Sequence, residues 1–129
     1  MKRSLTVLAG IVLLLVATVA YQLITLENSS HSGITGAAMK SLMIALEDCK
    51  RICGRYPTTA EGLETLLEGH ELCKVYTPLG PQFRENLHDA WGNPFIYTSD
   101  GHTYRLLSAG HKWIESAPGT EPTEVERPE

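Results

Sequence analysis

The chain has 129 residues, a net charge of −4 and 43% hydrophobic residues. Its 11 basic residues are scattered along the chain, which excludes the clustered positive charge of a nucleic-acid-binding protein. Once the apolar N-terminal segment is set aside, about a hundred residues remain, which is enough for one small domain but not for two.

An apolar run extends from Leu5 to Ile24, directly after Lys2 and Arg3, and contains no charged residue. At about 1.5 Å per residue, a helix of this length spans roughly the 30 Å hydrocarbon core of a bilayer. The preceding positive charges place the N-terminus in the cytoplasm. A signal peptide cleaved after Ala20 is the alternative, but the small-residue position before that bond fits poorly. We therefore predict a retained anchor over residues 1–27.

The next segment, from Asn28 to Gly33, consists of small and polar residues and predicts either a helix break or a flexible neck, which we place at residues 28–36. From about Ile34 to Ile52, apolar residues recur every three or four positions, as on one face of an amphipathic helix. Gly54 is well placed to end this helix. The apolar stripe consists of Met39, Leu42, Leu46, Cys49 and Cys53.

A turn and a short second helix are expected next. Tyr56-Pro57 fixes an extended conformation, because the residue before a proline is kept out of the helical region. The segment Thr58–Glu61 resembles a capping box, which would begin a helix that ends at about Leu67. Gly62 weakens this helix slightly. Residues 68–87 contain two prolines and are expected to form a loop.

The most informative stretch follows this loop. Asp89-Ala90-Trp91-Gly92-Asn93-Pro94 predicts a rigid turn, because proline fixes its own φ and glycine permits backbone angles closed to other residues. Two runs rich in aromatic and β-branched residues, 95–98 and 103–107, lie on either side of Asp100-Gly101, which is a strong hairpin signal. The stretch therefore predicts a turn that leads into an antiparallel hairpin.

The three cysteines leave alternatives open. A disulfide from Cys73 to Cys49 or Cys53 would close a loop of about 20 residues and stabilise the fold by roughly 3 kcal/mol. A location outside the cytoplasm favours this bond. A zinc site of the three cysteines with His70 is a permissible ligand set, but its spacing matches no standard signature. Buried free thiols at Cys49 and Cys53 are the third possibility. The disulfide is the preferred interpretation.

No set of residues points to an enzyme. The 5 histidines are dispersed, and no nucleophile–base pair is evident. His88 and Asp89 do not read as a base with its orienting carboxylate, because adjacent side chains rarely face one another in that way. Trp91 and Tyr97 are expected in the core rather than on a ligand platform. We therefore predict no catalytic residue, no metal site and no small-molecule substrate.

These motifs, in this order, resemble the major pseudopilins of type II secretion over roughly residues 37–110. The resemblance implies an α+β fold in which the helix packs on a small antiparallel sheet, and a family that assembles a short periplasmic filament. It rests on the amphipathic helix, Gly54-Arg55-Tyr56-Pro57-Thr58-Thr59-Ala60-Glu61-Gly62-Leu63, Asp89-Ala90-Trp91-Gly92-Asn93-Pro94-Phe95 and Tyr104 to Gly110. It assigns a structural role to Tyr56, Pro57, Gly62, Asp89, Trp91, Gly92, Asn93 and Pro94, with Asp89 bracing the turn before Trp91.

The N-terminus departs from the family pattern. Family members have a short basic leader, a glycine cleavage site and, shortly after it, a glutamate inside the apolar helix. Here Gly10 is followed by Ile11-Val12-Leu13-Leu14-Leu15, and Glu27 is the first acidic residue. The chain is therefore expected to lack the prepilin cleavage motif, and with it the carboxylate that pairs with a neighbouring N-terminal amine in the filament.

The C-terminus departs from the family pattern as well. Family members continue after the last strand into an Asp-rich loop that holds calcium. The corresponding stretch from His111 to Glu121 has no aspartate, and only Glu115 and Glu121 could serve as ligands, with Lys112 opposing them. Because calcium takes six to eight oxygen ligands, we expect no bound calcium and a mobile C-terminal segment.

The sequence thus predicts four regions: an anchor over 1–27, a neck over 28–36, a pseudopilin-like periplasmic domain over 37–115 and an acidic flexible tail over 116–129. The predicted function is structural, as a component or accessory of a type II secretion or pilus-like apparatus. Its partners would be the lipid bilayer of the inner membrane and other secretion-apparatus proteins. The alternatives are a tethered periplasmic binding module that does not polymerise and, less favoured, a thiol- or zinc-dependent periplasmic protein.

Overall fold

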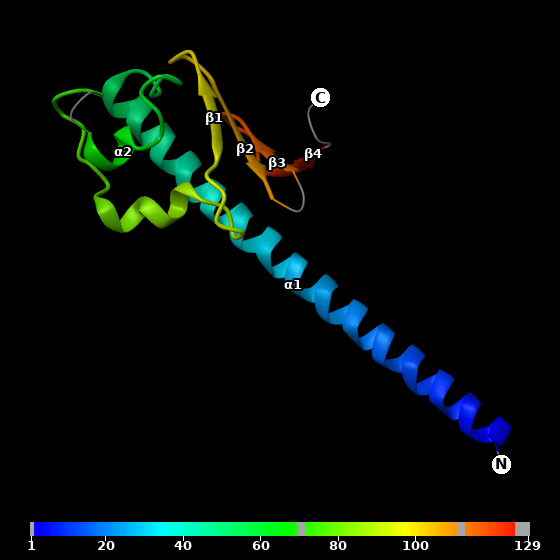
Figure 1. Cartoon of the computed structure of the whole chain (residues 1–129). Helices are drawn as coiled ribbons and strands as arrows, with labels where there is room; N and C mark the ends of the chain where they lie inside the picture. Colours follow the sequence, from blue (N-terminus) through cyan, green and yellow to red (C-terminus); the bar gives the residue numbers. More distant parts are fainter. Residues whose placement is uncertain (1, 70–71, 111–112, 126–129) are drawn as a thin grey trace. The chain divides into compact units, whose positions relative to one another are not determined.

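A computed structural model describes residues 2–69, 72–110 and 113–125. The chain divides into two compact units, residues 1–30 and 31–129. The first unit is helical, and the second contains helices and a four-stranded antiparallel sheet (Figure 1). The predicted α+β class is therefore confirmed.

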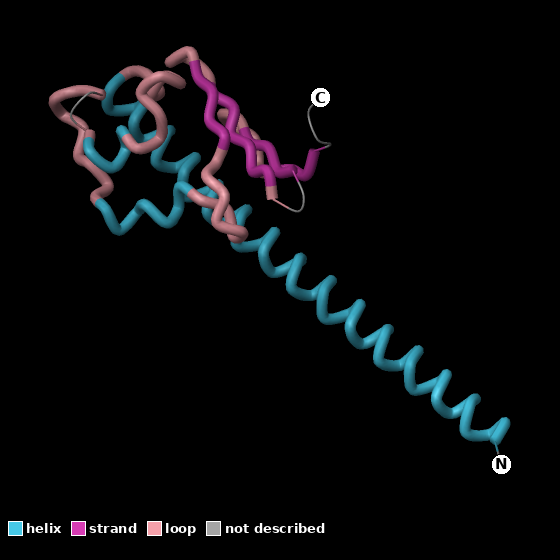
Figure 2. Tube along the Cα trace, in the orientation of Figure 1, coloured by secondary structure: helices cyan, strands magenta, loops and turns pink. Residues whose placement is uncertain are grey.

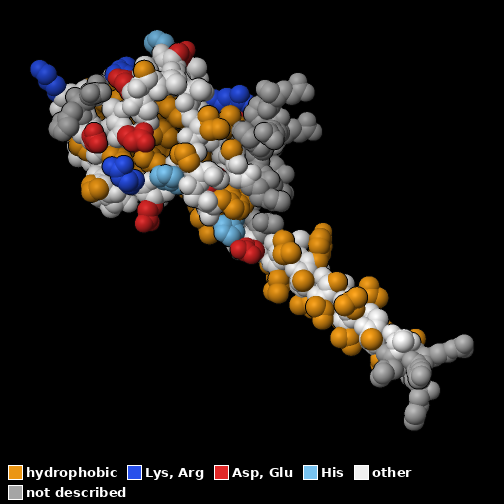
Figure 3. Space-filling model, in the orientation of Figure 1, with side chains coloured by type: hydrophobic (Ala, Val, Ile, Leu, Met, Phe, Trp, Pro, Cys, Tyr) orange, Lys and Arg blue, Asp and Glu red, His pale blue; other side chains and the backbone are white. Residues whose placement is uncertain are grey.

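The first unit belongs to helix α1 (Lys2–Cys53). Its large apolar side chains are exposed, and they cover the surface of this segment (Figure 3). Within the described residues, α1 is one helix that is long and apolar enough to cross a membrane, and none of its most apolar window is buried. The exposed apolar residues are Val7, Leu8, Ile11, Val12, Leu13, Leu14, Leu15, Val16, Val19, Tyr21, Leu23, Ile24 and Leu26.

The predicted helix break at residues 28–33 is wrong, because α1 continues through them (Figure 2). Hydroxyl groups in this region bond within the helix: Ser29 Oγ donates to the Thr25 carbonyl at 2.9 Å, and Thr25 Oγ1 donates to the Gln22 carbonyl at 2.8 Å. The Ser29 hydroxyl bonds back to the helix in this way and is compatible with a helical backbone. Tertiary contacts within the second unit also hold the part of α1 that follows, since Thr35 is fully buried.

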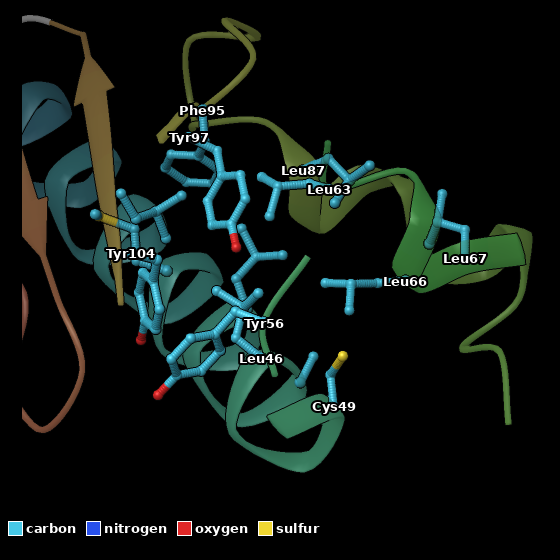
Figure 4. Close-up of a cluster of buried hydrophobic side chains, with 14 of the residues drawn as sticks. Leu46, Cys49, Tyr56, Leu63, Leu66, Leu67, Leu87, Phe95, Tyr97 and Tyr104 are labelled. Carbon is cyan, nitrogen blue, oxygen red and sulfur yellow. The ribbon is translucent and has the colours of Figure 1, made fainter. Parts of the chain in front are cut away.

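In the second unit, α1 contributes its predicted apolar stripe to the core. Met39, Leu42, Leu46 and Cys49 are fully buried, while Cys53 is only partly buried. The stripe packs against leucines and aromatic residues of later segments, including Leu66, Leu106, Tyr56 and Tyr97 (Figure 4). Burial of each such side chain contributes about 1.5–3 kcal/mol, so this face is what joins the helix to the domain.

The segment after α1 is less helical than predicted. Helix α2 spans only Thr65–Glu68, since Gly62 has a φ of +73° and interrupts the chain between the capping-box residues and the helix. The predicted loop over 68–87 is wrong in its last part, where the 3-10 helix η1 (Pro81–Leu87) forms behind an N-terminal proline. Leu87 is its buried residue and joins η1 to the core.

The sheet has the order β1-β2-β3-β4, and all neighbours are antiparallel. The predicted hairpin is confirmed: β1 (Ile96–Ser99) pairs with β2 (Tyr104–Ala109) in a register that places Tyr97 opposite Leu106. Strands β3 (Trp113–Ser116) and β4 (Thr123–Val125) extend this sheet. The expectation of a mobile segment after Gly110 is therefore wrong for residues 113–116 and 123–125.

Candidate functional site

The turn at residues 89–94 is built around the buried carboxylate of Asp89. Its Oδ1 accepts hydrogen bonds from the backbone N–H groups of Trp91 (3.0 Å) and Asn93 (2.9 Å). Its Oδ2 accepts from Asn93 Nδ2 (3.2 Å) and from the hydroxyl of Ser108 in β2 (3.0 Å). The carboxylate is thus committed to bracing the turn and fastening it to the sheet.

The same turn is fastened to α1. The backbone N–H of Ala90 donates to Thr35 Oγ1 at 3.1 Å, and both Thr35 and Ser108 are fully buried. The turn therefore links the helix to the sheet through hydroxyl groups on each. The sequence analysis missed these two residues. Thr35 lies four residues before Met39, the first residue of the apolar stripe, and this spacing is the signal that could have found it.

Trp91 is only partly buried and does not belong to the core. The prediction of a core tryptophan is therefore wrong. Its ring is partly exposed and stacks on the His31 ring, with a centroid distance of 5.4 Å and an interplanar angle of 24°. A Cβ on Gly110 would overlap the Trp91 ring, so the ring requires glycine at that position. Tyr97, in contrast, is buried as predicted, and its hydroxyl donates to the Pro57 carbonyl at 2.7 Å.

Tyr56 and Pro57 are both fully buried and join the end of α1 to the hairpin. The Tyr56 hydroxyl donates to Glu47 Oε1 at 2.7 Å, and the Lys50 ammonium lies 4.6 Å from the Tyr56 ring centroid. The Tyr56 N–H donates to the Gly101 carbonyl at 2.9 Å. Burial, together with the Glu47 carboxylate, raises the pKa of Tyr56 well above its usual value, so the phenol stays protonated and acts as a donor.

Arg55 and Glu61 form an ion pair at the turn over residues 58–62. Arg55 donates two hydrogen bonds of 2.6 Å to the two carboxylate oxygens of Glu61, and Glu61 Oε2 also accepts from the Thr58 N–H at 2.7 Å. These bonds, with the Arg55 pair contributing most, lower the pKa of Glu61 from 4.5 to about 2. The capping-box contacts therefore form, but they close a turn that ends at Gly62 instead of beginning a helix.

The cysteines form one crosslink. Cys53 at the end of α1 is bonded to Cys73, and Cys49 is a buried free thiol whose Sγ lies 3.5 Å from the Arg55 carbonyl. Burial raises the pKa of the Cys49 thiol, which makes it a poor nucleophile. The zinc interpretation is wrong for this structure, because two of its four ligands are bonded to each other. Its fourth ligand, His70, lies outside the described residues.

The residues after β2 do not fit a calcium ion. Glu115 is engaged by Arg105 through both carboxylate oxygens, and Glu121 Oε2 lies 2.6 Å from Lys40 Nζ. Over the described part of the chain, no three His, Cys, Asp or Glu side chains lie close enough together to hold a metal ion. His111 and Lys112, which belong to the same stretch, lie outside the described residues.

The hollows of the second unit are open grooves. One groove, with a volume of about 680 Å³, lies between α1 and residues 118–121 and is lined by Met43, Ile44 and Glu47 among others. His88 and His102 are exposed, and Asp89 next to His88 is already bonded four times. The described residues therefore form a crosslinked scaffold with open surface grooves, and they contain no set of groups arranged for catalysis.

A model of the protein family described as type II secretion system (T2SS), protein G, matches residues 22–126. The matched region includes the turn at Asp89, the Tyr56-Pro57 segment and all four strands, and it leaves out residues 1–21. No curated protein and no solved structure matches the chain.

Proposed function

The chain belongs to the type II secretion system protein G family and is therefore a pseudopilin component of type II secretion, and we propose that it works there as a subunit tethered by an uncleaved anchor. Family membership implies a structural protein that associates with other pseudopilins of the secretion apparatus. The observation that carries the proposal is the combination of a braced scaffold in residues 31–129 with an apolar first unit in which no acidic residue precedes Glu27.

The retained anchor is supported by the composition of α1. Residues 5–24 contain no charge and form a helix of the length that a bilayer requires, and residues 6–24 of this helix are exposed. Gly10 is followed by five aliphatic residues, and Glu27 is the first acidic residue of the chain. A prepilin peptidase would therefore find no cleavage motif here, and the lipid bilayer of the inner membrane would remain a permanent partner of the subunit.

The proposed topology places the N-terminus in the cytoplasm and residues 37–129 in the periplasm. Lys2 and Arg3 precede the apolar run, which favours this orientation. The Cys53–Cys73 bond supports it independently, because disulfides persist in the periplasm and are reduced in the cytosol. Residues 28–36 would then carry the helix from the membrane into the periplasmic domain.

A second candidate is a periplasmic binding module that keeps the fold without entering the filament. The observation that favours it is the absence of an acidic residue before Glu27. Family members have a glutamate inside the apolar helix, and its carboxylate pairs with a neighbouring N-terminal amine during polymerisation. In this case the domain would meet the secretion apparatus as a single tethered copy.

The test begins with the intact mass of the full chain extracted from membranes. We expect the unprocessed mass of 14.2 kDa, and a mature chain that starts at Ile11 or Tyr21 would contradict the retained anchor. Chemical crosslinking in cells that contain the other pseudopilins then separates the candidates. A ladder of crosslinked copies supports the filament subunit, whereas a single crosslinked heterodimer supports the binding module.

A further inference from the structure

The C-terminal part of the domain contains two carboxylates that already have cationic partners. Arg105 of β2 donates from Nε and Nη2 to the two oxygens of Glu115 in β3, at 2.5 and 2.9 Å. Lys40 of α1 lies 2.6 Å from an oxygen of Glu121, in the loop between β3 and β4. Each negative charge is thus balanced by a side chain of the same domain, which leaves little charge for an added cation.

The two carboxylates also line different hollows. Glu115 lines a groove on the sheet together with Thr98 and Arg105, whereas Glu121 lines the groove beside Met43 on α1. A calcium ion needs six to eight oxygens around one point, and several of them must be carboxylate oxygens to neutralise its charge. Glu115 and Glu121 do not meet at one point in this way.

The loop between β3 and β4 is closed by the chain itself. Thr120 Oγ1 accepts a hydrogen bond from the Ala117 N–H (3.0 Å) and donates one to the Ala117 carbonyl (2.9 Å), and the Thr120 N–H also donates to that carbonyl (3.1 Å). Pro118 and Gly119, with a φ of +73° at the glycine, are the residues that a type II turn requires at its two central positions. Ser116 Oγ lies 2.8 Å from Met43 Sδ and fixes the start of the loop on α1.

We propose that Lys40 and Thr120 hold the β3–β4 loop in place of a metal ion, so that the C-terminal part of this domain folds independently of calcium. The ammonium of Lys40 supplies the positive charge, and the Thr120 hydroxyl supplies the closing hydrogen bonds. The inference concerns the loop itself and stands whether or not the chain enters a filament.

Hydrogen exchange of the full chain in detergent micelles tests this directly, with the amides of residues 117–125 as the readout. In the unmodified protein these amides exchange at the same rate in millimolar calcium and in chelator. Lys40→Met speeds their exchange about two- to fivefold, the range expected for an exposed ion pair. Arg51→Met is the matched control, because it breaks the Arg51–Asp48 pair on the same helix and leaves the loop unchanged.

Two further variants guard against a general loss of structure. Lys40→Glu combined with Glu121→Lys restores the slow exchange, because the ion pair re-forms with its charges reversed. Thr120→Val speeds exchange about tenfold, because it leaves the Ala117 N–H without its partner. The proposal is overturned if calcium slows the exchange of these amides relative to chelator. It is also overturned if Lys40→Met behaves like Arg51→Met.

Discussion

Removal of the Asp89 carboxylate should destabilise this domain more than any other single polar substitution. Asp89→Ala leaves the Ser108 hydroxyl, which is fully buried, without a partner, and a buried unsatisfied group costs about 1–3 kcal/mol. The turn also loses two backbone hydrogen bonds, from Trp91 and Asn93, at about 0.5–1.5 kcal/mol each. The total is about 2–6 kcal/mol, a large part of the stability of a small domain.

Thermal unfolding of the full chain in detergent, followed by circular dichroism, measures this effect. A loss of 3 kcal/mol lowers the midpoint of a domain of this size by at least about 12 °C. Asp89→Asn should cost only about 1 kcal/mol, because its remaining oxygen still accepts the two turn N–H groups. His88→Ala is the matched control, since its side chain is exposed, and it should leave the midpoint unchanged.

A double-mutant cycle locates the cause. When Ser108→Ala is added to Asp89→Ala, the buried hydroxyl is removed and part of the lost stability returns, with a coupling energy of about 1–2 kcal/mol. If Asp89→Ala and His88→Ala unfold within about 1 kcal/mol of each other, the carboxylate does not brace the turn and the reasoning is refuted.

Three further predictions concern other parts of the scaffold. Trp91→Ala should lower the free energy of unfolding by about 1–3 kcal/mol, which is less than the loss expected for a fully buried tryptophan. Denaturant titration measures this change. Because the pKa of Glu61 is lowered to about 2, its pair with Arg55 stabilises the fold above pH 4.5. This stability is lost as the pH falls towards 2. Glu61→Gln should therefore flatten this part of the curve of stability against pH. Cys73→Ser should cost about 3 kcal/mol, and a reductant should lower the unmodified protein to the same stability without affecting the variant.

The hairpin and the apolar stripe of α1 could be read from the sequence because local chemistry decides them. Asp100-Gly101 demands a turn, and the three- and four-residue spacing of Met39, Leu42 and Leu46 leaves one face to bury. For both elements, the local sequence preference and the tertiary packing favour the same structure.

Tertiary context decided the elements that the sequence analysis missed. Polar residues 28–33 predicted a break, but a helix that packs through Thr35 and the residues after it tolerates hydroxyl groups that bond back to the helix. Strand β4 has only three residues and no alternating pattern of its own, so its pairing with β3 is what defines it. Trp91 was expected in the core rather than on a ligand platform, yet its place depends on a glycine nineteen positions later, which no local pattern reveals.

The two tyrosines that pack edge to face beside α1 should respond in opposite ways to loss of their hydroxyl groups. The ring centroids of Tyr56 and Tyr104 are 4.9 Å apart, and both hydroxyls point away from the centre of the apolar cluster (Figure 4). The Tyr56 hydroxyl donates to Glu47, but the buried Tyr104 hydroxyl has no hydrogen-bond partner among the described residues. Burial raises the pKa of Tyr104 to about 12, so the group remains a neutral, unsatisfied phenol at every pH at which the protein is handled.

Tyr104→Phe therefore removes a polar group that gains nothing from its position, and it should raise the free energy of unfolding by about 0–1 kcal/mol. Tyr56→Phe keeps the same ring contact and removes a hydrogen bond to a charged acceptor, so it should lower the free energy of unfolding by about 1.5–3 kcal/mol. Denaturant titration of both variants at neutral pH gives the comparison, and the shared loss of one hydroxyl makes each the control for the other. If Tyr104→Phe is the more destabilising of the two, its hydroxyl has a partner in solution, and the groove that Tyr104 lines with Arg105 and Glu115 is then the place to look for a bound water or ligand.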